Sequence, residues 1–136
     1  LYNVHLKSIG ITASVNSLQE QDKEKLFKRL ATTFERQQEH TEVILKHMNT
    51  TKHPIVLAGD LNNTAFSYVY RKLQQNMNDA FIEKGKGLGT TFMFDYYPMR
   101  IDYIFGSKQL EVLEFTSLKQ TFSDHFPVAA VFGIPK

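Results

Sequence analysis

The sequence of 136 residues contains no cysteine. Disulfide bonds and thiolate metal sites are therefore excluded, and any metal ion must be held by oxygen or imidazole ligands. No apolar run approaches the length that a membrane-spanning helix needs. No glycine or proline lies between residues 17 and 48. That interval is consequently open to a long helix, which either residue would interrupt.

The sequence also lacks a strong charge bias, with 16 basic and 14 acidic residues and a formal net charge of +2. Nucleic-acid-binding domains are usually more basic and carry their basic residues in clusters. Here Lys23, Lys25, Lys28 and Arg29 fall on a predicted helix among acidic residues. This pattern is typical of a solvated helix face rather than of a track for phosphates. The charge balance therefore does not identify a substrate.

Hydrophobic residues make up 42% of the sequence, which is enough for one core. No internal repeat, low-complexity segment or linker divides the chain, so we predict a single domain over residues 1–136. The printed sequence starts in a strand-like segment at Leu1 without an initiator methionine. We therefore expect a truncated domain, and we make no prediction of its cellular location.

The centre of the sequence is the segment Ile-Val-Leu-Ala-Gly-Asp-Leu-Asn at residues 55–62. Its apolar start predicts a strand buried on both faces of a sheet, and Gly59 allows the chain to bend where the strand ends. Asp60 and Asn62 are two residues apart, so an extended chain points both side chains the same way. Ligand sites of open α/β sheets lie at such strand ends. Structural capping is the alternative explanation for this polar pair.

The remaining pattern predicts strands that bracket two helices without strict alternation, and hence a mixed sheet with helices packed on it. A capping box at residues 17–20 opens the first helix, which should either break before Leu26 or overhang at its first turn. Asn62, Asn63 and Thr64 are plausible caps of the second helix. The predicted elements are strands at 2–7, 55–60, 80–83 (weakly), 90–94, 100–105, 110–118 and 126–132, helices at 17–48 and 64–73, turns at 76–79 and 95–98, and a glycine-rich loop at 85–89. This loop is not a P-loop, because no Gly-Lys-Ser/Thr follows it. The strand at 126–132 is expected to be central.

Short polar motifs sit at the ends of these strands or within them. They are Asn-x-His-Leu at 3–6, Gly-Asp-x-Asn at 59–62, Arg-x-Asp-Tyr-Ile at 100–104 and Ser-Asp-His-x-Pro-Val at 123–128. Each is weak alone, and His5 by itself fits the polar outer face of an edge strand. In this order the set resembles the endonuclease/exonuclease/phosphatase family. The resemblance implies an α/β fold of the deoxyribonuclease I-like type, in which this chain corresponds to the later half of a four-layer α/β/β/α sandwich.

Members of that family hydrolyse phosphodiesters or phosphomonoesters with a divalent metal, so the resemblance implies Mg²⁺, or alternatively Mn²⁺. It makes His5, Asp60, Asp102 and His125 catalytic. Asp60 would orient or deprotonate the attacking water, His125 would contact the phosphate, and Asp102 would orient His125 and keep it cationic. His5 would bind phosphate or assist the leaving group. In the same comparison Asn3 and Asn62 bind substrate and Asp124 ligates the metal.

The sequence departs from the family pattern in two places. Asn63 stands where many relatives carry an acid. The family's principal metal-ligating glutamate belongs to an amino-terminal segment that these residues do not include. Because one carboxylate from Asp124 is a poor Mg²⁺ site, we expect weak metal binding and little activity from these residues alone. The missing amino-terminal half is an expected partner, and uncovered sheet surface favours dimerisation or strand exchange.

Two other functions are open to this pattern. A binding or scaffolding domain could keep the fold without catalysis, although the complete set of polar motifs argues against it. A binuclear metallophosphatase is excluded because no Gly-Asn-His motif follows Gly59 and Asp60. The sequence does not distinguish nucleic acid, inositol phosphate or a lipid head group as the phosphoester substrate, because loops set that choice.

Overall fold

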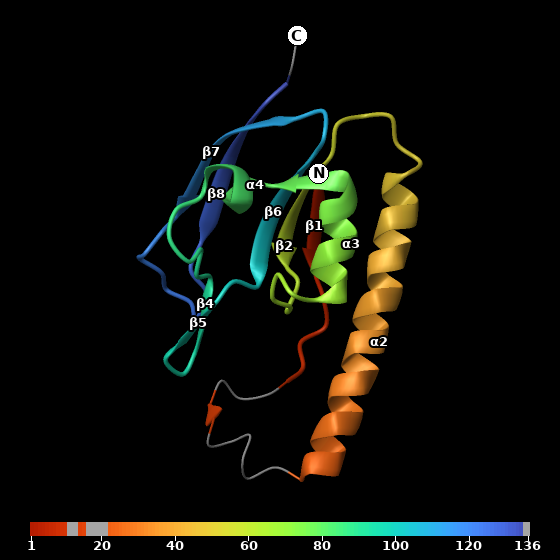
Figure 1. Ribbon diagram of the computed structural model, residues 1–136, viewed down its shortest axis with the longest axis vertical. Coiled ribbons are helices and arrows are strands. Elements are labelled where there is room, and N and C mark those ends of the chain that lie inside the picture. Colours follow the sequence, from red (N-terminus) through yellow and green to blue (C-terminus); the bar gives the residue numbers. More distant parts are fainter. Residues whose placement is uncertain (11–13, 16–21, 135–136) are drawn as a thin grey trace.

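The chain is a mixed α/β structure, seen in a computed structural model that describes residues 1–10, 14–15 and 22–134 (Figure 1). The elements in chain order are β1 (Tyr2–His5), α2 (Lys23–Met48), β2 (Val56–Asp60), α3 (Tyr68–Asn76), β3 (Met77–Asp79), α4 (Ala80–Lys84), β4 (Phe92–Phe94), β5 (Tyr97–Met99), β6 (Asp102–Ser107), β7 (Glu111–Ser117) and β8 (Val128–Gly133). The capping box expected at residues 17–20 lies outside the described residues. None of the described helices has the length and apolar character of a membrane span.

The main sheet has four strands in the order β1-β2-β6-β3. β1 runs parallel to β2, and β6 runs antiparallel to both β2 and β3, so the predicted mixed sheet is confirmed. Gly59 lies opposite Val4 in the β1–β2 pair and has a φ of +148°. A Cβ atom at this position would lie 1.8 Å from the Val4 carbonyl oxygen. Only glycine therefore lets the two strands pair beside Asp60.

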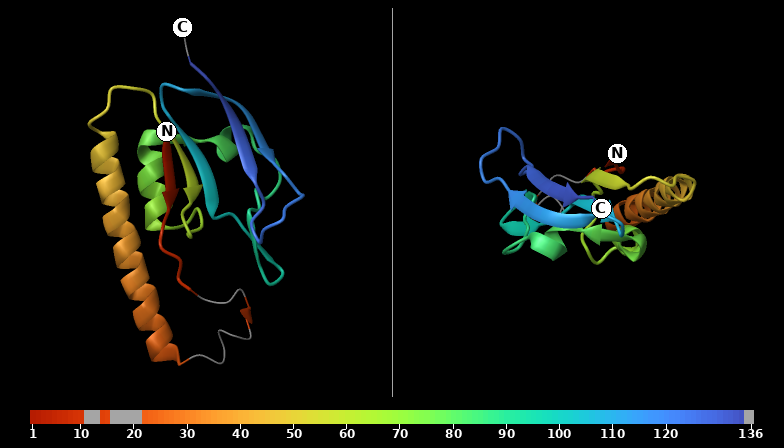
Figure 2. Two further views of the ribbon diagram at one scale, coloured as in Figure 1. Left: turned by 180° about the vertical axis from the view of Figure 1, so that it is seen from behind. Right: turned by 90° about the horizontal axis from the view of Figure 1, so that it is seen from above.

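One face of this sheet packs against α2 and α3. Seen from behind, β1, β2, β6 and β8 lie in front of α3, and no helix covers them on that side (Figure 2). Alternate residues of the strands, among them Leu57, Tyr103 and Phe105, point into the core and are almost completely buried. Met48 of α2 and Leu73 of α3 close the same core from the helix layer.

Helix α2 begins after Asp22, whose side chain accepts hydrogen bonds from the backbone N–H groups of Glu24 and Lys25. It is continuous to Met48, and its first turns project beyond the sheet (Figure 1), which agrees with the overhang alternative. Gln37 is completely buried in its middle. The Gln37 amide donates to the Lys7 carbonyl at 2.6 Å and accepts from Asn63 Nδ2 at 2.8 Å. This side chain thus fixes to α2 the two segments that follow β1 and β2.

Three local predictions are wrong. Helix α3 starts at Tyr68 with Ser67 as its N-cap, later than the expected start at 64. The predicted turn at 76–79 is largely strand β3, because residues 77–79 pair with β6. The weak strand predicted at 80–83 is helix α4, whose N-cap is Asp79. In each case a contact distant in sequence, or a cap, overrides a weak local preference.

The last strands form two hairpins outside the main sheet. β4 pairs with β5 over residues 92–99. The predicted turn at 95–98 is therefore shorter than expected, because residues 97–99 form β5, which follows β4 and precedes β6 in the chain. β7 pairs with β8, and both strands were predicted. Among the described residues β8 pairs only with β7, so the expectation of a central strand is wrong. Val131 of β8 is accordingly 49% exposed.

Candidate active site

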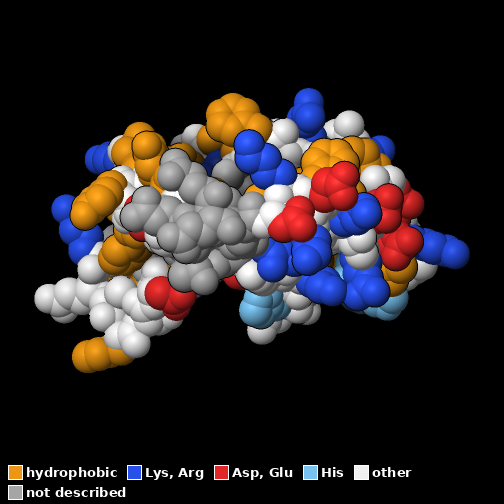
Figure 3. Space-filling view, turned by 90° about the horizontal axis from the view of Figure 1, so that it is seen from below, with side chains coloured by type: hydrophobic (Ala, Val, Ile, Leu, Met, Phe, Trp, Pro, Cys, Tyr) orange, Lys and Arg blue, Asp and Glu red, His pale blue; other side chains and the backbone are white. Residues whose placement is uncertain are grey.

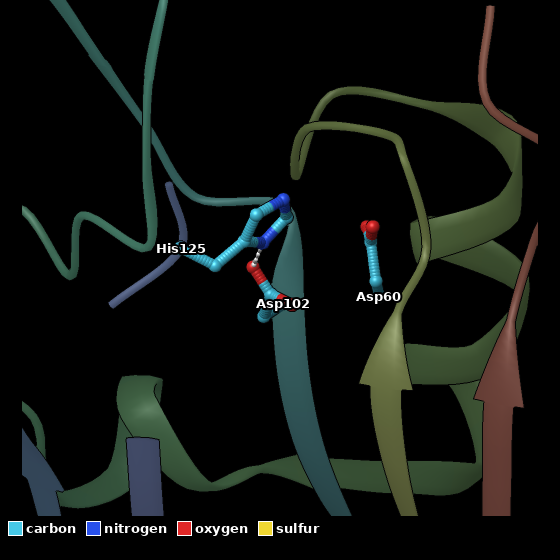
Figure 4. A group of neighbouring side chains, drawn as sticks. All are labelled: Asp60, Asp102 and His125. Atoms are coloured by element: carbon cyan, nitrogen blue, oxygen red, sulfur yellow. Dashed lines mark hydrogen bonds and ion pairs between the residues drawn. The ribbon is translucent and has the colours of Figure 1, made fainter. Parts of the chain in front are cut away.

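The polar motifs meet at one edge of the main sheet. In the strand register His5 lies opposite Asp60, and Asp60 lies opposite Asp102. β1 and β2 end at this edge, whereas the antiparallel β6 begins there. His125 arrives from the segment before β8, and the three side chains of Asp60, Asp102 and His125 point toward one another (Figure 4). A mixed sheet therefore places at one point four residues that are up to 120 positions apart in sequence.

Asp102 and His125 form a pair, with 2.8 Å between His125 Nδ1 and Asp102 Oδ2. Because a carboxylate only accepts hydrogen bonds, Nδ1 carries the proton and the other ring nitrogen is directed away from Asp102 (Figure 4). The Thr121 hydroxyl donates to the His125 carbonyl at 2.6 Å, and the Phe92 ring lies 5.0 Å from the imidazole centroid. Asp102 and Phe92 thus contact the imidazole itself, and Thr121 holds the backbone that carries it.

Asp60 is held by Asn62, the other polar residue of the central motif. The backbone N–H of Asn62 donates to Asp60 Oδ1 at 2.7 Å, and its side-chain amide donates to Oδ2 at 2.9 Å. Asn62 has a φ of +50° and its amide also donates to the Leu6 carbonyl at 3.0 Å. His5 Nε2 lies 3.6 Å from Asp60 Oδ2. The hydrogen bonds of Asn62 that cap the end of β2 are therefore the same ones that orient the Asp60 carboxylate in the site.

The pKa of the Asp60 carboxyl is raised above its ordinary value, chiefly because burial penalises the charged form. The hydrogen bond from Asn62 opposes this rise, and the negative charge of Asp102 adds to it. The positive charges of His125 and His5 act in the lowering direction. A carboxylate in this setting is stabilised by any further cation that enters the cleft.

The side chains of Asp60, Asp102 and His125 each offer one potential ligand atom, and these atoms lie within 4.8 Å of one another. Two carboxylates suit a hard divalent cation such as Mg²⁺, whereas imidazole is a less favoured ligand for that ion. Asp102 is also engaged by His125, and Asp60 by Asn62, so a cation would use the remaining lone pairs of these carboxylates. The residues present fit a divalent ion, and nothing in their geometry selects which ion.

The other predicted site residues lie around the same point. A cleft of about 510 Å³ is lined by His5, Asp60, Asn62, Asp124 and His125. Asp124 is exposed, and its Oδ1 accepts a hydrogen bond from the Ser123 hydroxyl at 3.1 Å. It lies outside the group of three possible ligands, so its role as a metal ligand stays a prediction.

Asn3 does not line this cleft. It lines an adjoining hollow of about 390 Å³, together with Asp102 and His125. Its register partner in β2 is Ala58, so it stands two residues back from His5 along β1 on the same face of the strand. Asn3 therefore lies beside the site, in the adjoining hollow rather than in the cleft itself.

Two residues that position the site are absent from the sequence predictions. Thr91 is completely buried, and its hydroxyl accepts hydrogen bonds from the backbone N–H groups of Ile101 and Asp102, both at 3.0 Å. The Phe92 ring packs against the His125 imidazole at a tilt of 47°. A single threonine and a single phenylalanine carry no sequence signal for such roles. By contrast Asn63, the departure from the family pattern, is buried under α2 and bonds to Gln37, away from the cleft.

Several solved structures share this fold. A protein of unknown function from Enterococcus faecalis matches with a TM-score of 0.70 and 22% identity, covering 98% of this chain and 49% of its own. A mannosyl-6-phosphatase from Bacteroides thetaiotaomicron matches with a TM-score of 0.64 and 22% identity, covering 74% and 46%. The catalytic domain of human Nocturnin, with a bound sulfate anion, matches with a TM-score of 0.58 and 19% identity, covering 98% and 46%.

The chain thus spans about half the length of each of these structures. At these identities they show that the fold is shared. No curated protein sequence matches the chain significantly. The model of the endonuclease/exonuclease/phosphatase family, however, matches residues 27–125, which include the strand end at Asp60 and the pair of Asp102 and His125. Because this match covers most of its 136 residues, the chain belongs to the endonuclease/exonuclease/phosphatase family.

Proposed function

We propose that the protein containing this chain hydrolyses a phosphodiester or phosphomonoester with the help of a divalent cation, at the cleft between His5, Asp60 and His125. The observation that carries this proposal is the Asp102–His125 pair, 2.8 Å apart, beside a carboxylate that burial makes more basic than usual. The family is generally hydrolytic. A relative named as a phosphatase and another that holds a sulfate anion give further support for a phosphate-directed site.

Asp60 is the group that orients the attacking water and accepts its proton. Burial raises its pKa, which strengthens the carboxylate as a base. Asn62 holds both carboxylate oxygens through its two hydrogen bonds, so the carboxylate keeps one orientation. A base held in this way avoids reorganisation during the reaction.

His125 is the group that binds a phosphoryl oxygen. Asp102 accepts a hydrogen bond from its Nδ1, so Nε2 is not engaged by Asp102, and a proton on Nε2 would donate a charge-assisted hydrogen bond to the phosphoryl oxygen. His5 lies on the other side of Asp60 and is well exposed, with 74% of its side chain accessible, so it can reach the leaving oxygen. Asn3 contributes an amide group for a further substrate oxygen. The two amide N–H groups of Asn62 already bond to Asp60 and Leu6, so Asn62 binds substrate only by exchanging one of these bonds.

A divalent cation, held by Asp60 and, as the resemblance implies, by Asp124, would supply positive charge to the phosphoryl oxygens. Mg²⁺ is the ion we propose, with Mn²⁺ as a substitute, because the carboxylate ligands are hard oxygen donors. We also propose that residues 1–136 alone have little activity. The few carboxylates in the cleft make a weak Mg²⁺ site, and a further carboxylate from outside these residues would strengthen it.

Substitution of the two central residues tests the proposal in the longest natural protein that carries this chain. His125→Ala and Asp60→Ala are each expected to lower the Mg²⁺-dependent hydrolysis of bis(p-nitrophenyl) phosphate or p-nitrophenyl phosphate by about 10²–10⁴-fold. His40→Ala, which removes an exposed histidine of α2, is the matched control and should retain the wild-type rate. Asp124→Ala should raise the Mg²⁺ concentration needed for half-maximal rate. Near wild-type rates in both central variants would rule out this mechanism.

A further inference from the structure

A second groove continues from the candidate active site toward the start of α2. It has a volume of about 420 Å³ and lies between the segment after β1 and one face of the helix. Ser8 and Ile9 line both this groove and the cleft that holds His5 and Asp60. The two hollows therefore share a wall, and a ligand in one can extend into the other.

The charged side chains that line this groove are all basic. They are Lys7 from the end of β1 and Lys28 and Arg29 from α2, and no acidic residue of the described chain lines the groove with them. On α2, Lys28 and Arg29 are each followed four positions later by a threonine, so cations and hydroxyls lie on the same helix face. In Figure 3, Lys and Arg side chains lie on this side of the molecule with Asp and Glu side chains among them, so the basic character belongs to the lining of the groove. We call this surface the basic groove.

The wall of the basic groove is held in place by backbone contacts. The Gln37 side chain of α2 donates to the Lys7 carbonyl at 2.6 Å, which ties the end of β1 to the helix. Gly10 has a φ of +66°, and its backbone N–H donates to the Ser8 hydroxyl at 3.1 Å. The space that a Cβ atom of Gly10 would occupy is open. The segment therefore turns at Gly10, where it lines the groove and leaves open space beside it.

The distance from the reacting centre suits a neighbouring phosphate. A chain spans at most about 3.6 Å per residue, so the Cα atoms of His5 and Lys7 are at most about 7 Å apart. This is the scale of one nucleotide or one sugar ring. The basic residues of α2, which the sequence pattern alone assigns to a solvated helix face, line the same groove as Lys7.

We propose that the basic groove binds a second phosphate group of the substrate, one that is not hydrolysed, through Lys7 and Lys28. This inference rests on the proposed function for the reacting phosphate, and it adds a substrate class: compounds with at least two phosphates. The second phosphate belongs either to a nucleic acid backbone or to a small polyphosphorylated compound. The chemistry recognised is the same in both, because ammonium groups bind each phosphate as point charges.

The test compares substrates that differ by one phosphate, in the longest natural protein that carries this chain. One pair is glucose 1,6-bisphosphate and glucose 6-phosphate, and the other is a thymidine dinucleotide with and without a 5′-phosphate. We expect kcat/KM to be at least about tenfold higher for the member with the extra phosphate in one pair, and that pair identifies the source. Lys28→Glu and Lys7→Glu should each remove most of this preference, and Lys28→Gln should remove a smaller part.

Lys52→Glu is the matched control, because it makes the same charge change in the exposed turn at the opposite end of α2. It should leave the preference unchanged. Two results would overturn the inference. One is a wild-type enzyme that shows no preference in either pair, and the other is an equally large preference in Lys28→Glu and Lys52→Glu. Circular dichroism and the Tm of each variant confirm that the fold is retained.

A separate measurement keeps this inference distinct from the proposed function. If the wild-type protein hydrolyses none of these substrates, the proposed function fails. Calorimetric binding of inorganic pyrophosphate then tests whether the basic groove is an anion site. Binding that Lys28→Glu weakens about tenfold, and Lys52→Glu leaves unchanged, would retain the anion site. Equal affinities in the two variants would overturn it.

Discussion

Asp60 is the residue whose environment decides the chemistry of the site. Its carboxylate is largely buried, it receives two hydrogen bonds from Asn62, and it shares the cleft edge with the negative charge of Asp102. Burial dominates these effects and raises its pKa. The folded chain therefore holds a proton on Asp60 to a higher pH than the unfolded chain does.

This difference predicts how the stability of the metal-free chain depends on pH. The unfolding free energy that Asp60 contributes is largest below the carboxyl's ordinary pKa of 3.8 and falls as pH rises through the raised folded pKa. The fall is at most about 1.4 kcal/mol for each pH unit in that window. Urea unfolding in EDTA at several pH values, for wild type and Asp60→Asn, should show the wild type losing stability relative to the variant. A difference that is constant with pH contradicts the raised pKa.

At the residue scale, the sequence predicts the site where it is built from strand ends. His5, Asp60 and Asp102 are short polar residues at or beside the ends of recognisable strands, and the resemblance supplies the partner of His125. Thr91 and Phe92 could not be predicted in the same way. Thr91 matters because it bonds to the backbone of Asp102 at the start of β6, and Phe92 matters because it packs against His125. These are contacts between segments distant in the sequence, which no periodicity encodes.

At the scale of elements, the junction between β3 and α4 depends on one buried ion pair. Arg100 Nη1 lies 2.6 Å from Asp79 Oδ2, and their side chains are only 9% and 1% exposed. Asp79 also accepts from the Tyr70 hydroxyl at 2.8 Å and from the Phe81 backbone N–H at 2.9 Å. Burial and the nearby Asp79 raise the pKa of Tyr70 to about 12. The guanidinium is further enclosed by the ring of Tyr103, 4.6 Å away.

Removing the cation from this pair should be strongly destabilising. Arg100→Met leaves the Asp79 carboxylate buried without its partner, so we expect a loss of about 3–5 kcal/mol in the free energy of unfolding. Lys108→Met is the matched control. Lys108 bonds to Asn78, which belongs to β3 as Asp79 does, but this bond lies at an exposed position. It should cost less than about 1 kcal/mol. Equal losses in the two variants, measured by urea denaturation at pH 7, would contradict the structural role given to Arg100.

The same junction explains where the element predictions fail. Residues 76–79 have a turn-like composition, yet residues 77–79 pair with β6. Asp79 forms the ion pair with Arg100 and caps the start of α4, and these contacts hold the segment in place. The helix to Met48 was predictable because its apolar periodicity is long and consistent, and the strand at 55–60 was predictable because it begins with an uninterrupted apolar run. Short elements such as β3, α4 and β5 lack that length, so tertiary contacts decide their conformation.

At the scale of the whole molecule, the main sheet is covered by helices on one side only (Figure 2). On this uncovered face lies the hollow that Asn3, Asp102 and His125 line, and its wall also includes the apolar side chains of Ala58, Ile104 and Val128. The chain spans about half the length of the solved structures it resembles. Apolar surface of this kind normally packs against further protein.

We therefore expect residues 1–136 to self-associate when prepared alone. Sedimentation velocity from micromolar to high micromolar concentration should show a concentration-dependent dimer or larger species. Ile104→Lys should shift the distribution toward monomer, because it places a charge in the hollow. Val43→Lys, at an exposed apolar position of α2, is the control and should associate like the wild type. A monomer at every wild-type concentration counts against this expectation.

The central claim is that the cleft between Asp60 and His125 hydrolyses phosphoesters with a divalent cation. It is tested most directly by the steady-state rate of p-nitrophenyl phosphoester hydrolysis by the longest natural protein that carries this chain, with Mg²⁺ and with EDTA. The account predicts a Mg²⁺-dependent rate that Asp60→Ala and His125→Ala each reduce by about 10²–10⁴-fold and that His40→Ala leaves unchanged. A rate that persists in EDTA, or that survives both substitutions, would contradict it.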